Sequence, residues 1–379
     1  MNASSHLISR WNHDRPKRIL TIDGGGVRGM IAIQFLSEIE KHVCTTNDCQ
    51  VLSDYFDLIG GTSTGSIIAS LLSLGKSVEE IDRLYRFLTK VVFKKRWLGS
   101  LTGGNFSARF SKSAFRKLCS ELIGDLTLGS EEIQTGLMIV TRRTDTGSPW
   151  VIHNNPDSKY FSCEDNSFVP NSEYRLAQVI MASCSAPTFF VPERIEIGRM
   201  PDGRTETGVF IDGACTPHNN PSLLAYRLVT VKGFGYCWPT GAENLEMVSV
   251  GTGRITNKFD QLHFKPAALF GIQALRGLLD DCAREVEITM QLLSESPTTR
   301  TIDSEIGDLM GEYISHKPMF GYLRYNVDLE SEALSKILNR QVDRAEVKSL
   351  QSIDRAELVS TYAEIGRSAS MMAVDPKHF

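Results

Sequence analysis

The sequence of 379 residues has no long hydrophobic run and no secretory signal pattern. Its most apolar stretches, such as residues 67–74, are far shorter than the roughly 18 residues that a membrane-spanning helix requires. Residues 1–18 are rich in histidine, arginine and lysine and lack an apolar core followed by a small-residue cleavage site. We therefore expect a cytoplasmic protein that does not cross a bilayer by itself.

The sequence also has little net charge, no closely spaced cysteine pairs and no metal-ligand motif. Lys plus Arg number 41 and Asp plus Glu 45, so no basic excess is present to neutralise a nucleic-acid backbone. The eight cysteines form no Cys-x-x-Cys pair, which favours free thiols in a reducing compartment. No His-Glu-x-x-His motif occurs. We expect neither a nucleic-acid polymer as partner nor a bound metal or cofactor.

Strand and helix patterns alternate along the chain. Residues 18–23 form a β-branched run that stops at three glycines, and residues 30–43 carry apolar residues at helical spacing. The same order of strand, glycine turn and helix recurs over residues 55–59, 60–65 and 67–74. Further strands are predicted at 137–141, 150–153, 208–211 and 246–250, and helices at 79–96, 175–180, 266–296 and 331–372. This alternation predicts an α/β fold with a mixed sheet flanked by helices.

The strongest catalytic signal is Gly61-Thr62-Ser63-Thr64-Gly65, which lies between a predicted strand and a predicted helix. A nucleophilic serine on so tight a turn needs small neighbours two positions to either side, and the turn exposes its hydroxyl at the helix N-terminus. Gly-x-Ser-x-Gly also occurs by chance as a plain glycine turn. Its placement after a strand favours Ser63 as a nucleophile.

The second signal is the run Asp23-Gly24-Gly25-Gly26-Val27-Arg28-Gly29. It also fits the Gly-x-Gly-x-x-Gly pattern of dinucleotide-binding folds, so a nucleotide-dependent oxidoreductase is an alternative. That fold needs an acidic residue ending a second strand about 20 residues further on, and the chain offers only Asp48 in a polar turn. Backbone N–H groups before a helix bind an oxyanion as well as a phosphate. Beside a serine nucleophile, an oxyanion hole is the simpler interpretation.

The serine needs a base, and the chain offers two kinds of candidate. Asp212-Gly213-Ala214 ends a predicted strand, where the carboxylate can take the proton of Ser63 directly in a Ser-Asp dyad. A Ser-His-Asp triad would need a histidine late in the chain, and none has a persuasive local setting. These histidines are His153, His218, His263, His316 and His378. A triad that includes His218 or a later histidine is the alternative.

In this order, the three motifs resemble those of the patatin-like phospholipase family, and residues 219–221 and 249–253 are similar to later landmarks of that family. The resemblance implies a three-layer α/β fold and a phospholipase A type activity that uses neither metal nor cofactor. It implies that Ser63 is the nucleophile and Asp212 its base, acting through an acyl-serine intermediate. Further implied site residues are Gly24, Gly25, Gly26 and Arg28 at the oxyanion hole, Gly61 and Gly65 at the nucleophile elbow, and Gly213 and Ala214 beside the base. A non-catalytic lipid-binding module with a vestigial dyad is the other alternative.

The length and the helical C-terminal region are similar to those of phospholipase effectors in cyclic-oligonucleotide anti-phage signalling. This resemblance implies a cytoplasmic enzyme that is peripheral at the membrane when active and is switched on by a cyclic oligonucleotide. The basic helix 83–96 and the loop after Trp97 are the candidate membrane contact, although a basic face is equally typical of a scaffold helix.

We divide the chain into an N-terminal extension (1–16), a phospholipase domain (17–330) and a C-terminal helical segment (331–379). The C-terminal segment packs on the same domain, regulates it or forms a homo-oligomer surface.

Overall fold

A single mixed β-sheet forms the centre of the molecule. The computed structural model describes residues 3–93, 110–200, 202, 204–255 and 267–379. Within these residues the sheet has nine strands in the order β5-β6-β3-β2-β1-β7-β9-β8, with β4 paired to β3. The strands are β1 (Lys17–Ile22), β2 (Leu58–Thr62), β3 (Gly136–Arg143), β4 (Ser148–His153), β5 (Glu193–Arg199), β6 (Thr205–Asp212), β7 (Leu245–Val250), β8 (Ser294–Glu295) and β9 (Phe320–Tyr325).

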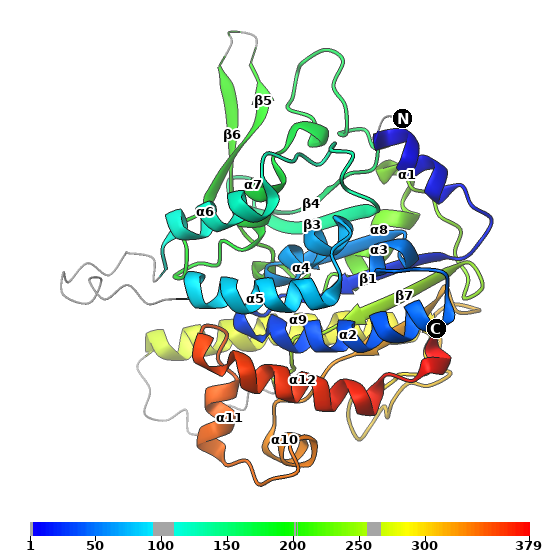
Figure 1. The fold of residues 1–379 in the computed structure, drawn as a ribbon, viewed down its shortest axis with the longest axis vertical. Helices are drawn as coiled ribbons and strands as arrows, with labels where there is room; N and C mark the ends of the chain where they lie inside the picture. Colours follow the sequence, from blue (N-terminus) through cyan, green and yellow to red (C-terminus); the bar gives the residue numbers. More distant parts are fainter. Residues whose placement is uncertain (1–2, 94–109, 201, 203, 256–266) are drawn as a thin grey trace, which may run out of the picture.

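Helices cover both faces of this sheet (Figure 1). They are α1 (Ala3–Trp11), α2 (Gly29–Thr46), α3 (Leu52–Tyr55), α4 (Thr64–Ser73), α5 (Val78–Val92), α6 (Lys112–Ile123), α7 (Leu176–Ser183), α8 (Ser222–Thr230), α9 (Ala267–Leu293), α10 (Ser331–Ile337), α11 (Arg344–Leu350) and α12 (Val359–Ala373). No helix among the described residues is long and apolar enough to span a membrane.

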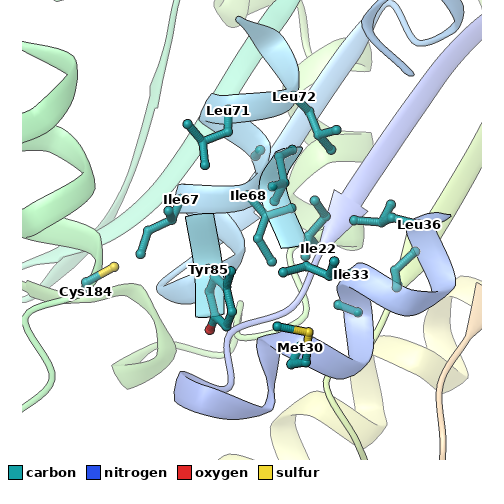
Figure 2. Packing of buried hydrophobic residues seen from close by; sticks show 14 of the residues in the cluster. Ile22, Met30, Ile33, Leu36, Ile67, Ile68, Leu71, Leu72, Tyr85 and Cys184 are labelled. Carbon is teal, nitrogen blue, oxygen red and sulfur yellow. The ribbon is translucent and has the colours of Figure 1, made fainter. Parts of the chain in front are cut away.

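The two faces of the sheet carry separate hydrophobic cores because successive side chains of a strand point to opposite faces. Ile19 of β1 packs in the core with α1, α8 and α9, whereas Leu20 packs in the larger core with α2, α4 and α5. Figure 2 shows the larger core, where Ile22 of β1 lies among Ile33 of α2 and Ile68 of α4. The expected α/β fold, with a mixed sheet between two helical layers, is confirmed.

The structure corrects several predicted boundaries. The strand predicted from Tyr55 begins at Leu58, because residues 52–55 form the short helix α3 and Asp57 turns inward to bind Arg15 and the amide of Arg18. The continuous helix predicted over 331–372 is three helices, α10, α11 and α12. Strands β5 and β9 and helices α1, α6 and α8 were not predicted.

Both terminal segments pack against the central body. On α1, the side chain of Trp11 is buried and its indole donates to the carbonyl of Asp57 at 3.0 Å. Helix α12 runs along α2 (Figure 1), with Gly366 at a close approach to α2. Just before α12, the carbonyl of Ile353 accepts the amide of Val27 at 2.9 Å. The C-terminal segment therefore contacts the glycine-rich run directly.

Candidate active site

Ser63 stands on a sharp turn between β2 and α4. Its φ of 53° lies in the left-handed region, which residues other than glycine rarely adopt. A Cβ on Gly61 would lie 2.1 Å from the carbonyl oxygen of Gly65, and one on Gly65 would lie 2.2 Å from that of Ile22. Both glycines are thus required by close backbone contacts. This is the geometry of a nucleophile elbow.

Strand pairing brings Asp212 to the same place. Thr62, which ends β2, pairs with Val140 of β3, and Asp212, which ends β6, pairs with Thr141 on the other side of β3. The Ser63 hydroxyl donates to Oδ2 of Asp212 at 2.6 Å. The second carboxylate oxygen, Oδ1, accepts the amide of Ala214 at 2.8 Å. The two residues predicted as a dyad are therefore in direct contact.

The environment of Asp212 makes it a stronger base than an ordinary aspartate. Burial raises its pKa to about 7, although the hydrogen bonds from Ser63 and from the Ala214 amide lower it in part. No lysine or arginine pairs with this carboxylate among the residues that the structure describes. A base with a pKa near the working pH transfers protons efficiently in both directions.

His218 does not take part in this contact. Its Nε2 lies 3.1 Å from a guanidinium nitrogen of Arg227, and its Nδ1 is buried with no partner in the described part of the chain. Burial, followed by the charge of Arg227, lowers its pKa to about 4. His378 bonds to the hydroxyl of Tyr325, and His263 lies outside the described residues. The geometry favours a dyad over a triad.

The glycine-rich run offers two free amides beside the elbow. The amide of Gly24 donates to the carbonyl of Asn219 at 3.2 Å, so it is not available to an oxyanion in this structure. Within the described ranges, the amides of Gly25 and Gly26 have no acceptor. The carbonyl of Gly26 is held by the hydroxyls of Thr64 and Tyr85. Of the three glycine amides predicted as oxyanion donors, those of Gly25 and Gly26 are thus free in this structure.

Arg28 is buried directly before α2, next to these amides. Its Nε and Nη1 atoms have no hydrogen-bond partner in the described ranges. Burial lowers the pKa of this guanidinium, partly offset by nearby groups led by Tyr362. A buried cation with unpaired donors is suited to an anionic group of a ligand.

Sequence reasoning missed the residues that hold the elbow and the loop. The hydroxyl of Ser183 accepts the amide of Ser63 at 2.8 Å and donates to the carbonyl of Val140 at 2.6 Å. The hydroxyl of Thr252 donates to the carbonyl of Gly24 at 2.7 Å. For Thr252 the sequence offered only the family resemblance of residues 249–253. The small-residue turn at Ser183 contains no local sign of a distant partner.

The described part of the proposed membrane contact is less basic than its sequence indicates. On α5, Arg83 pairs with Glu79 and Arg86 pairs with Asp82. Lys94, Lys95, Arg96 and the loop after Trp97 lie outside the described residues. No cluster of histidine, cysteine or carboxylate side chains that could hold a metal ion occurs in the described ranges.

The chain is similar to known phospholipases. The family model of patatin-like phospholipases matches residues 20–226. Patatin-like protein 1 of Arabidopsis thaliana is 29% identical over 72% of this chain and 67% of that protein. The cUMP-AMP-activated phospholipase of Escherichia coli is 31% identical over 66% of this chain and 69% of its own length. A cGAMP-activated phospholipase of Vibrio cholerae is 24% identical over 89% of this chain and 88% of its own length.

The match and the fold define a serine hydrolase that acts on carboxylic esters. The chain belongs to the patatin-like phospholipase family. The oxidoreductase alternative is therefore wrong: after the glycine-rich run, the next strand, β2, ends at Thr62 and leads to Ser63 instead of to a ribose-binding acid.

Proposed function

We propose that this protein is a lipid acyl hydrolase of the phospholipase A type in which Ser63 is the nucleophile and Asp212 its base. One observation carries the proposal, the 2.6 Å hydrogen bond from the Ser63 hydroxyl to a buried carboxylate that has no cationic partner among the described residues. The names of the bacterial relatives, which are phospholipases, support phospholipid as the substrate.

In the proposed reaction, Oγ of Ser63 attacks the acyl carbonyl while Asp212 takes its proton. The amides of Gly25 and Gly26 stabilise the negative charge on the carbonyl oxygen, and Arg28 meets the lipid phosphate. Asp212 then gives the proton to the departing lysolipid oxygen, which leaves Ser63 acylated. Water attacks this ester, Asp212 takes a proton from the water, and fatty acid leaves as the proton returns to Ser63. A positioned base contributes roughly 10²–10⁴-fold to such a step.

We further infer that a cyclic oligonucleotide activates the enzyme at a membrane surface in anti-phage defence. The names of the Escherichia coli and Vibrio cholerae relatives support this regulation. Ser63 is only 9% exposed, and we infer that activation opens the site to the lipid. A ligand that binds an open state more tightly than the closed one would shift the population toward activity.

The deciding experiment measures fatty-acid release from phospholipid vesicles by the wild type, Ser63→Ala and a control, Ser70→Ala. Ser70 lies in α4, the helix that follows Ser63, and its hydroxyl donates to the backbone carbonyl of Ser66. We expect release by the wild type and by Ser70→Ala, and none by Ser63→Ala. Each protein is assayed with no nucleotide, with cUMP-AMP and with cGAMP.

Each outcome has a distinct meaning. Release that requires one nucleotide supports the gated enzyme, and release without any nucleotide contradicts the gating but not the hydrolase. Vesicle binding without release, together with no labelling of Ser63 by a fluorophosphonate, would favour the non-catalytic lipid-binding module and overturn the proposal.

A further inference from the structure

Asp23 opens the glycine-rich run, yet the proposed reaction gives it no task. It follows β1 and directly precedes Gly24, and its side chain is buried. Arg324 of β9 holds both oxygens of its carboxylate, with Nη1 3.0 Å from Oδ1 and Nη2 2.6 Å from Oδ2. Two parallel N–H to oxygen bonds fix both the position and the orientation of a carboxylate.

Arg324 is itself anchored in the sheet. Its Nη1 also donates to the hydroxyl of Ser249 on β7 at 2.7 Å. The hydroxyl of Ser222, at the start of α8, donates to Ser249 at 2.8 Å and lies 3.1 Å from that of Thr21 on β1. The guanidinium therefore joins three neighbouring strands at the edge where the glycine-rich run begins.

Each buried partner alters the pKa of the other. Burial lowers the pKa of Arg324, but the Asp23 carboxylate outweighs this effect and the net direction is upward. Burial raises the pKa of Asp23, and Arg324 offsets only part of that rise. Both side chains are buried, so displacing either one would leave the other without its partner, and this cost keeps the carboxylate in place.

We propose that Arg324 is a positioning residue for the oxyanion hole, and that it acts by clamping Asp23. The inference rests on the proposed function. Asp23 is joined to Gly25 by a single residue, so a turn of its carboxylate toward solvent would displace the amides of Gly25 and Gly26. Arg324 lies almost 100 residues beyond the end of the family match at residue 226. The C-terminal third of the chain thus supplies part of the machinery.

The chain offers a matched control at the opposite end of the same strands. There Arg15 donates two hydrogen bonds to the buried carboxylate of Asp57, from Nη1 to Oδ2 at 2.9 Å and from Nη2 to Oδ1 at 2.6 Å. Asp57 precedes β2, whereas Ser63 follows it. Removing the Asp57–Arg15 pair should lower the melting temperature as much as removing the Asp23–Arg324 pair, but it should leave the amides of the oxyanion hole in place.

The experiment compares Arg324→Met, Arg324→Lys and Asp23→Asn/Arg324→Met with the control Asp57→Asn/Arg15→Met. The measurements are kcat and KM on a soluble p-nitrophenyl acyl ester, the rate of labelling by a fluorophosphonate, the melting temperature and the pH midpoint of activity. We expect Arg324→Met to lower kcat and the labelling rate by about 10²-fold, because a small misplacement of a catalytic group costs that much.

Several readouts separate positioning from a general loss of structure. KM and the pH midpoint should stay unchanged, and the double variant at Asp23 and Arg324 should be no slower than Arg324→Met. Arg324→Lys keeps the positive charge but cannot form both hydrogen bonds to Asp23, and its kcat should be about tenfold lower than that of wild type. The control should melt lower and keep its kcat within threefold.

The inference is overturned if folded Arg324→Met, or Arg324→Lys where the former does not fold, keeps kcat and labelling within threefold of wild type. It is also overturned if the Asp57 control loses activity as strongly. Failure of the proposed function would look different, because the wild type itself would then be unlabelled at Ser63 even with cUMP-AMP or cGAMP present.

Discussion

Two buried aspartates lie at the same edge of the sheet, and each is followed by glycine. Asp212 ends β6 before Gly213, and Asp23 follows β1 before Gly24. Their surroundings differ: within the described residues, Arg324 binds the Asp23 carboxylate through two hydrogen bonds, whereas the Asp212 carboxylate accepts a serine hydroxyl and a backbone amide. We therefore propose that the same Asp-Gly dipeptide is a support in one place and a base in the other.

The physical reason is the cost of burying a charge. A carboxylate without a cation shifts its pKa upward to lessen that cost, and the pKa of Asp212 reaches about 7 for this reason. A carboxylate with a bidentate arginine can stay ionised, which makes it a fixed anchor but a poor base. Asp212 contacts the Ser63 hydroxyl and has no cation on its carboxylate among the described residues, so it is the aspartate that we expect to exchange protons with Ser63.

The largest expected effect comes from removing the carboxylate that has no cation. Asp212→Asn should lower kcat on a soluble ester by about 10³-fold, because the amide cannot accept the serine proton. Asp23→Asn should cost about 10²-fold through misplacement of the loop. Steady-state kinetics on both variants provide the test. Equal losses, or a larger loss for Asp23→Asn, would contradict the assignment of the two roles.

The sequence predicts the base more readily than the support. Ser63 and Asp212 are visible because glycines mark the turns that carry them, and close backbone contacts at Gly61, Gly65 and Gly213 explain that requirement. Arg324 is a single arginine in the segment Phe-Gly-Tyr-Leu-Arg-Tyr, and nothing local indicates its partner 301 residues away.

The same reason accounts for the other errors. Strand β9 was missed because neither face of Phe320–Tyr325 shows a clear apolar alternation, yet it is held between β7 and β8 by tertiary pairing. The sequence also contains no sign that the amide of Gly24, predicted as an oxyanion donor, bonds in this structure to the carbonyl of Asn219, almost 200 residues further along the chain. Local patterns locate turns and elements, whereas long-range partners decide what each group can do.

The raised pKa of Asp212 also makes the free energy of unfolding depend on pH. The pKa of Asp212 is about 7 in the folded protein and near 3.9 in an unfolded chain. Between about pH 4 and pH 7 the folded protein therefore holds a proton on Asp212 that the unfolded chain has lost. The stability that this protonated carboxyl contributes is fully present below about pH 4 and is lost as the pH rises to 7. Asp212→Asn has no such proton. We expect its free energy of unfolding, relative to wild type, to rise by up to about 4 kcal/mol from pH 4 to pH 8.

Chemical denaturation of wild type and Asp212→Asn at several pH values measures this difference. Asp202→Asn is the control, because Asp202 is exposed and its partner among the described residues is Arg204. A difference between Asp212→Asn and wild type that does not vary with pH would show that Asp212 is already ionised in the folded protein at low pH.

The smallest expected effect comes from giving Asp212 a cation of its own. Cys215 is a suitable position, since burial, and also the charge of Asp212, raise the pKa of its thiol to about 12. Cys215 is only partly buried, so Cys215→Lys can keep its ammonium group hydrated. The new charge should lower the pKa of Asp212 by about one unit and move the acid limb of the pH profile of kcat/KM downward by the same amount.

Cys215→Met supplies the volume without the charge and should leave that limb near pH 7. If Lys and Met at this position gave the same midpoint, the acid limb would belong to a group other than Asp212. A downward shift with lysine, accompanied by a lower plateau rate, would show Asp212 moving toward the state of Asp23, in which a bound cation makes the carboxylate a weaker base.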